Sequence, residues 1–170
     1  MSKIIASTSS LVSVIRSALT TLPSLRGWLE TGLVFAIFLC VAGYIGLHAD
    51  LFKVQLTDAW LQFAIIALVA ALAPALTEEV IFRVSLPQLF GGHPWAEGLA
   101  LGLFVLWHPM QTWLGLPTGQ ALFLQPTFLA IVLLLGLSCL FAWKRTKSIW
   151  PAITIHWVTV LVWKGLTTPI

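Results

Sequence analysis

The hydrophobic positions of this chain form long runs that are bounded by charged residues. A helix needs about 20 mostly apolar residues to cross a bilayer, so each run between charges is a candidate transmembrane span. Pro74 predicts a kink inside one of these runs. Five spans are predicted in all, at residues 31–49, 59–77, 97–115, 121–143 and 148–163.

Residues 1–26 show a different pattern, in which apolar side chains recur at helical spacing between serines, threonines and cations. Arg16 interrupts any apolar core of a secretory signal peptide, and no small-x-small cleavage site follows. The pattern favours an amphipathic helix that lies on one membrane face. We therefore expect an interfacial segment at 1–26 and a transmembrane domain at 27–170.

The composition agrees with a membrane protein, since 59% of the 170 residues are hydrophobic, only 9% are charged and the mean hydropathy is +0.97. Soluble domains have about 25% charged residues. This excludes an ordinary soluble enzyme, a disulfide scaffold and a disordered chain. The predicted fold is all-α: a polytopic membrane helix bundle with about five transmembrane helices, or six to eight helices if interfacial and broken ones are counted. The lipid bilayer is the first expected partner.

The net charge of +3 comes from scattered cations without a continuous basic face, which argues against a nucleic-acid partner. Cations precede the first span and recur at Lys144, Arg145 and Lys147. Four of the five alternating spans separate these two groups, so both lie on one side, which predicts a cytoplasmic N-terminus. Cys40 and Cys139 lie inside apolar runs without metal-ligand spacing and are interpreted as small residues that face lipid or a neighbouring helix.

Charges inside a span are costly and are therefore candidates for function. Glu79 and Arg83 are four residues apart, which places them on one helix face in the favourable order for an ion pair. Glu78 lies about 140° round the helix from Arg83 and has no local partner, which suits a general base. The alternative is that all three residues are solvated at the cytoplasmic end of the second span.

Two histidines fall within predicted spans, at positions 108 and 156. Counted from the cytoplasmic ends of their spans, both lie at a depth of roughly 12–17 Å. A kinked or late-starting helix brings Glu78 towards the same level, so one carboxylate and two imidazoles can converge in the cytoplasmic half of the bundle. His48 and His93 fall outside the span interiors and are expected to be interfacial.

Glu78, His108 and His156 together could perform three kinds of chemistry. They could activate a water for attack on a peptide carbonyl, with one histidine donating to the oxyanion. They could instead bind a zinc ion, although no HExxH motif is present. They could also relay protons in a transporter, although no internal repeat is visible.

The same residues lie in motifs that resemble those of the CAAX-protease and bacteriocin-processing (Abi-type) intramembrane endopeptidases. The first motif is Glu78-Glu79-x-x-x-Arg83, and the second is Phe104-x-x-x-His108. The third runs from Ser148 through Trp-Pro-Ala to His156. The order and spacing match over roughly residues 60–163. EExxxR alone is a weak signal, but the three motifs in sequence on hydrophobic helices are specific.

The resemblance implies that Glu78 and His108 activate the attacking water and that His156 contributes to the oxyanion site. Glu79, Arg83 and Phe104 would be supporting residues. It favours a mechanism without a metal cofactor; zinc held by the same catalytic three is the alternative.

The chain departs from the family pattern four residues after His156, where the family usually has Asn and this chain has Val160. Thr159 is the residue whose hydroxyl could substitute for the missing amide. The departure puts full activity in question, although it does not affect the expected fold.

The expected function is therefore an intramembrane endopeptidase of glutamic type, formerly described as a metalloprotease, that acts on a membrane-anchored or tagged polypeptide. The expected location is the bacterial inner membrane, with the active site towards the cytoplasmic half. A non-catalytic membrane scaffold or immunity-type protein with the same fold is the alternative, motivated by Val160 and the short chain. A small transporter is the third hypothesis.

Overall fold

Each of the five predicted spans corresponds to a helix in the computed structural model, which describes residues 8–169. The all-α prediction is confirmed. The α-helices are α1 (Thr8–Thr20), α2 (Leu25–His48), α3 (Trp60–Ala70), α4 (Thr77–Glu79), α5 (Leu86–Leu89), α6 (Pro94–Trp113), α7 (Pro126–Thr146) and α8 (Trp150–Leu166). The π-helical turns are η1 (Ala71–Leu76) and η2 (Val80–Ser85), η3 (Ala121–Leu124) is a 3-10 turn, and the strands are β1 (Phe52–Val54) and β2 (Thr167–Pro169).

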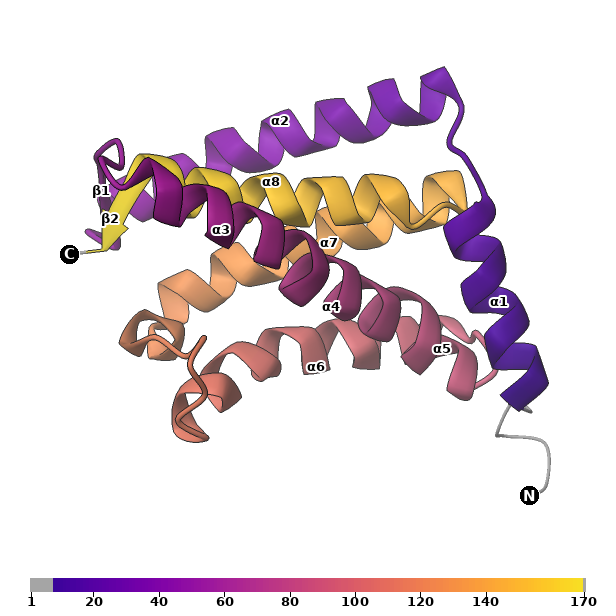
Figure 1. Ribbon diagram of the computed structural model, residues 1–170. Helices are drawn as coiled ribbons and strands as arrows, with labels where there is room; N and C mark the ends of the chain where they lie inside the picture. Colours follow the sequence, from indigo (N-terminus) through magenta and orange to yellow (C-terminus); the bar gives the residue numbers. More distant parts are fainter. Residues whose placement is uncertain (1–7, 170) are drawn as a thin grey trace.

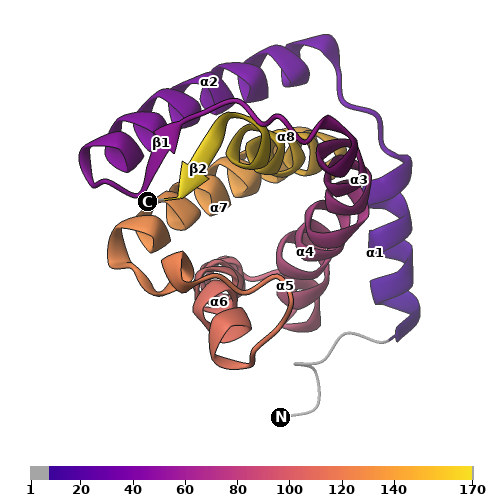
Figure 2. The ribbon, with the colours of Figure 1, turned by 60° about the vertical axis from the view of Figure 1, so that its left-hand side comes forward.

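Three helices of the described chain are long and apolar enough to cross a membrane: Leu25–His48, Trp60–Leu89 and Pro126–Thr146. The helices α6 and α8 have 20 and 17 residues, and a full crossing by them stays a prediction. The helix α7 packs against α2, α6 and α8 (Figure 1). Seen from one end, α2, α8, α3, α6 and α7 surround the middle of the molecule (Figure 2).

The second predicted span is a broken helix that continues well beyond its expected end. Helical geometry fails at Ala73, which has φ −134° and ψ 109°. The cause is Pro74, because a proline ring disfavours the helical conformation of the residue before it. The helix then restarts and runs to Leu89. The kink is confirmed, and the predicted end of the span before Glu78 is wrong.

The helix α1 lies across the ends of the other helices, beside the start of α8 (Figure 1). Ala18 is buried, and its carbonyl accepts a hydrogen bond from the Ile149 amide at 3.1 Å. The Trp150 indole donates to the Leu19 carbonyl at 2.8 Å. The predicted amphipathic segment is thus a helix over Thr8–Thr20, and residues 1–7 of that prediction lie outside the described chain. Its position at a membrane surface stays a prediction.

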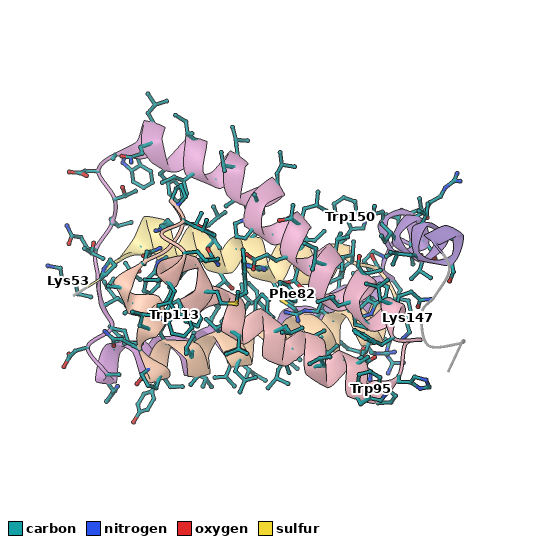
Figure 3. The ribbon with its side chains drawn as sticks, turned by 90° about the horizontal axis from the view of Figure 1, so that it is seen from below. Lys53, Phe82, Trp95, Trp113, Lys147 and Trp150 are labelled. Carbon is teal, nitrogen blue, oxygen red and sulfur yellow. The ribbon has the colours of Figure 1, made fainter. Side chains whose placement is uncertain are left out.

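Apart from the buried Glu78, Glu79 and Arg83, charged residues mark the two ends of the bundle. Lys147 lies at the end covered by α1, whereas Lys53 lies at the opposite end, with Phe82 between them (Figure 3). At the Lys147 end, Lys144 pairs with Glu97 at 2.6 Å and Arg145 pairs with Glu30. The opposite end is closed by the antiparallel pairing of β1 with β2, which joins the α2–α3 connection to the end of α8.

The contact between α6 and α7 depends on the absence of a side chain at Gly136. A Cβ atom there would lie 2.6 Å from Leu101 Cδ1 and 3.1 Å from Phe104 Cδ1. Glycine therefore lets α7 approach the part of α6 that carries Phe104, which is fully buried.

Gly136→Ala is expected to lower the free energy of unfolding by about 1–3 kcal/mol, because the added methyl group overpacks this contact. Gly102→Ala is the matched control, since a Cβ there meets nothing within 4 Å. Thermal unfolding of both variants in detergent measures the difference. Equal midpoints for the two variants would show that close packing at Gly136 is not required.

Candidate active site

A buried carboxylate, Glu79, connects two elements of the bundle. It lies in α4, is 0% exposed, and accepts a hydrogen bond from Arg83 Nε at 2.9 Å with Oε2. Its Oε1 is 2.8 Å from Nδ1 of His156 in α8. A carboxylate can only accept, so His156 Nδ1 is the donor in this contact. Glu79 therefore joins the broken helix to α8 and fixes the orientation of the His156 ring.

Arg83 completes this buried ion pair and lies on an aromatic ring. The residue is 2% exposed, and its guanidinium carbon is 4.4 Å from the centroid of the Phe104 ring in α6. A cation over an aromatic face is stabilised electrostatically. The predicted Glu79–Arg83 pair is present, and it lies inside the protein rather than at a solvated helix end. The solvated alternative is wrong, because Glu78, Glu79 and Arg83 are all buried.

Glu78 points in a different direction from Glu79, as adjacent helical residues are about 100° apart. Trp107 Nε1 donates to Glu78 Oε1 at 3.0 Å. The other oxygen, Oε2, is buried without a hydrogen-bond partner and lies 4.0 Å from Nε2 of His156. One oxygen of Glu78 is thus held in place, and the other is a buried acceptor without a hydrogen-bond partner.

His108 is fixed in one tautomer by its own helix. Its Nδ1 is 3.0 Å from the Phe104 carbonyl, which can only accept, so Nδ1 carries the proton. The ring lies among Phe104, Phe123 and Phe128, with ring centroids 5.2, 5.4 and 6.3 Å away. Nε2 is therefore left as an acceptor on the other side of the ring.

Glu78, His108 and His156 line one cavity of about 1060 Å³. The rest of its lining is mainly apolar and extends from α2 and α3 to α8. Trp107 and Gln111 of α6 also line it. The structure therefore brings the three predicted catalytic residues to one cavity, while Glu79 and Arg83 support the site from within the protein.

The two predicted residues in the second half of α8 contribute less polarity than expected. Thr159 lines the cavity, but its hydroxyl already donates to the Ile155 carbonyl at 2.7 Å. Val160 also lines the cavity. Position 160 thus presents an apolar side chain to the cavity that Glu78, His108 and His156 also line.

The buried charges of the site nearly cancel. Two carboxylates, Glu78 and Glu79, face one guanidinium, Arg83, within the same cluster. When both carboxylates are ionised, the cluster carries one negative charge in excess, and a net charge away from water is costly.

The donor set does not have the arrangement of a metal site. Within residues 8–169, no group of three His, Cys, Asp or Glu side chains is placed so that it could hold a metal ion. Zinc ligands converge on one point at about 2 Å. Oε2 of Glu78 and Nε2 of His156 are 4.0 Å apart, but His108 is not placed to act as a third ligand with them.

Two features of the site were missed by the sequence interpretation. Trp107 was not singled out, although it directly precedes His108. The hydrogen bond between Glu79 and His156 joins residues 77 positions apart, and no local spacing rule predicts it. His48 and His93 are exposed, Cys40 is exposed, and Cys139 is buried against the Ala152 carbonyl.

Fold and site together define an integral membrane helix bundle that encloses a carboxylate–histidine centre. Residues 59–162 match the family model described as "Type II CAAX prenyl endopeptidase Rce1-like". This match covers well over half of the chain, which therefore belongs to this family of membrane proteases, as its motifs predicted. No curated protein and no solved structure gave a match. The family match contains the whole site and excludes α1 and α2.

The two adjacent carboxylates are expected to differ in their effect on stability. Glu79→Gln should lower the free energy of unfolding by about 3–5 kcal/mol, because it leaves Arg83 buried without its counter-charge. Glu78→Gln should leave stability unchanged or raise it, because it removes a carboxylate whose Oε2 is unpartnered. Chemical unfolding of both variants in detergent provides the comparison. Equal destabilisation by the two changes would contradict this division of roles.

Proposed function

We propose that the protein hydrolyses a peptide bond of a membrane-associated polypeptide, with Glu78 as the general base. The observation that carries this proposal is Oε2 of Glu78, a buried carboxylate oxygen without a hydrogen-bond partner, 4.0 Å from His156 Nε2, on a residue that lines the cavity. Membership of a family of endopeptidases supplies the reaction class. It also favours this function over a transporter.

In the proposed mechanism, Glu78 Oε2 removes a proton from water as the water oxygen attacks the scissile carbonyl carbon. His108 Nε2 is an acceptor and orients the same water. The carbonyl electron pair moves to its oxygen, where protonated His156 Nε2 donates a hydrogen bond. Glu78 then gives its proton to the departing nitrogen as the carbon–nitrogen bond breaks.

Two neighbours hold these groups in the geometry that the reaction needs. Trp107 fixes Oε1 of Glu78, so that Oε2 is the oxygen presented to the water. Glu79 accepts from His156 Nδ1 and stabilises the imidazolium form that the oxyanion requires. Both contacts orient a reacting group without taking part in bond breaking.

The cavity supports a substrate that is itself apolar, because most of its lining consists of hydrophobic side chains. A membrane-anchored or tagged polypeptide has this character. The cationic end of the bundle, with Lys147 and α1, is placed on the cytoplasmic side by the positive-inside rule (Figure 3). We further propose that the protein lies in the inner membrane of a bacterium, with its site in the cytoplasmic half.

A non-catalytic scaffold is the second candidate function, and one observation favours it. Val160 lines the cavity where the family usually carries Asn, so a donor for the oxyanion is missing from α8. A scaffold would keep the ion pair of Glu79 and Arg83 for folding and would not need Glu78.

Glu78→Gln is expected to lower kcat/KM at least about 10²-fold, and His108→Ala and His156→Ala should each lower it by about 10²–10³-fold. The assay uses the protein in proteoliposomes with a quenched fluorescent farnesylated CAAX peptide. In parallel, mass spectrometry compares new peptide termini in native membranes that contain wild type or Glu78→Gln.

The matched controls carry the same changes at positions that do not line the cavity: Glu97→Gln, where the partly exposed carboxylate pairs with Lys144, and His93→Ala, at an exposed position. Both should cleave like wild type. Wild-type cleavage by all three site variants, or the absence of any terminus that depends on Glu78, would favour the scaffold instead.

Cleavage is further expected to persist after metal removal, because we propose that Glu78 and His108 activate the water without a metal. Purified protein dialysed against a chelator should keep at least about half of its activity, and elemental analysis should find less than stoichiometric zinc. An activity that is lost on chelation and regained with zinc would assign the reaction to a metal.

A further inference from the structure

Gln111 is a buried amide that the mechanism above does not use. It lies in α6, is 6% exposed and lines the same cavity as His108. The two residues are three positions apart and therefore lie on neighbouring parts of one helix face, about 4.5 Å apart along the axis. A polar side chain at this depth requires a partner or a function.

The carbonyl end of the Gln111 side chain is held by the loop that follows α6. The Thr118 hydroxyl donates to Gln111 Oε1 at 2.6 Å. This loop is fastened to the helix by a hydrogen bond from Leu116 N to the Gln111 backbone carbonyl at 3.0 Å. Thr112 Oγ1 also donates to the Gln120 carbonyl at 2.8 Å. The orientation of the amide is therefore fixed before any substrate binds.

The nitrogen end of the same amide is available. Across residues 8–169, Gln111 Nε2 donates to no other group, and it is not among the fully covered polar atoms that lack a partner. Since Oε1 is bound to Thr118 and the side chain lines the cavity, Nε2 is left facing the cavity. It is a donor without an acceptor.

Gln111 lies at the level where the site needs a second oxyanion donor. The rings of His108 and His156 both contact Phe104, at 5.2 and 5.8 Å between centroids. The helices α6 and α8 both start at the α1 end and run in the same direction (Figure 1). One turn further along each helix are Gln111 on α6 and Val160 on α8, so the two positions lie at similar depth.

The other polar groups of α8 near this level are already engaged. His156 Nδ1 donates to Glu79, and the Thr159 hydroxyl donates to the Ile155 carbonyl. Val160 has no polar atom in its side chain. The amide nitrogen of Gln111 is thus a donor on α6 in the cavity lining that has no acceptor within residues 8–169.

We propose that Gln111 is a catalytic residue, whose Nε2 donates a hydrogen bond to the scissile carbonyl oxygen as it becomes the oxyanion, and that Thr118 is its positioning residue. This inference rests on the proposed function. As the water oxygen bonds to the carbonyl carbon, Glu78 takes the water proton, and the carbonyl electron pair moves onto the oxygen bound by Gln111. The pair returns when the carbon–nitrogen bond breaks and Glu78 protonates the nitrogen.

The test measures kcat and KM in proteoliposomes with the farnesylated CAAX peptide. Gln111→Leu should lower kcat by about 10²–10³-fold with KM within about threefold of wild type, because the donor acts on the oxyanion and not on the bound substrate. Thr118→Val should lower kcat by about tenfold, and Thr118→Ser, which keeps the hydroxyl, should be close to wild type.

A rescue variant separates catalysis from folding. Val160→Asn places an amide at the same level on the opposite helix, and in the Gln111→Leu background it should raise kcat by at least about tenfold. A purely structural role of Gln111 would not be rescued there. If Gln111→Leu does not fold, the Thr118→Val and Thr118→Ser pair decides the question alone.

The outcomes distinguish this inference from the proposal on which it rests. A kcat of Gln111→Leu within threefold of wild type, with Glu78→Gln inactive, would overturn the role of Gln111 and leave the endopeptidase intact. A rise in KM alone, equal activity of both Thr118 variants, or a failure of Val160→Asn to raise kcat would also overturn it. If wild type does not cleave the peptide, both proposals fail for this class of substrate.

Discussion

The arrangement of the site depends on one carboxylate that is shared between two partners. Glu79 is completely buried, yet it carries a charge that Arg83 balances on one side and His156 binds on the other. In a medium of low polarity such a group is tolerated only when every oxygen is satisfied. The charge of Glu79 therefore stays paired only while three elements keep their relative positions. These are the broken helix, α8, and α6, which carries the Phe104 ring against Arg83. The contacts that stabilise the fold therefore also set the geometry of the site.

The break at Ala73 explains how one helix can serve both the membrane and the site. The segment before it, α3, is apolar and mostly exposed, as a lipid-facing helix should be. The segment after it carries the charged residues into the interior. Glu78 and Glu79 then face different surroundings because adjacent helical side chains diverge by about 100°. One carboxylate supports the structure, while its neighbour borders the cavity.

Much of this structure could be predicted from local patterns. Hydropathy predicts where all five main helices lie, and the spacing of Glu79 and Arg83 predicts their ion pair. The same spacing leaves Glu78 without a partner in its own helix. Charge was a misleading guide to where the second helix ends, since Glu78 was taken as a boundary and lies inside the helix. A carboxylate can lie inside the helix because neighbouring helices bury it. Such burial depends on distant parts of the chain, so the local sequence does not predict it.

Local patterns could not predict the contacts between distant parts of the chain. The Trp107 bond to Glu78, the His156 bond to Glu79 and the pairing of β1 with β2 each depend on how the helices assemble. The position of Gln111 in the cavity also depends on assembly. Its amide is oriented by Thr118, seven residues away in the loop, and it lines the cavity together with α8.

The adjacency of Glu78 and Glu79 has a consequence for how this sequence can vary in evolution. Three residues, 75–77, separate Pro74 from the first of the two acids. Their side chains can change, but their number cannot: one inserted or deleted residue would rotate everything beyond it by about 100°. The carboxylate that meets Arg83 and His156 would then turn away from them. The stretch between proline and the paired acids should therefore be constant in length among functional relatives, even where its composition drifts.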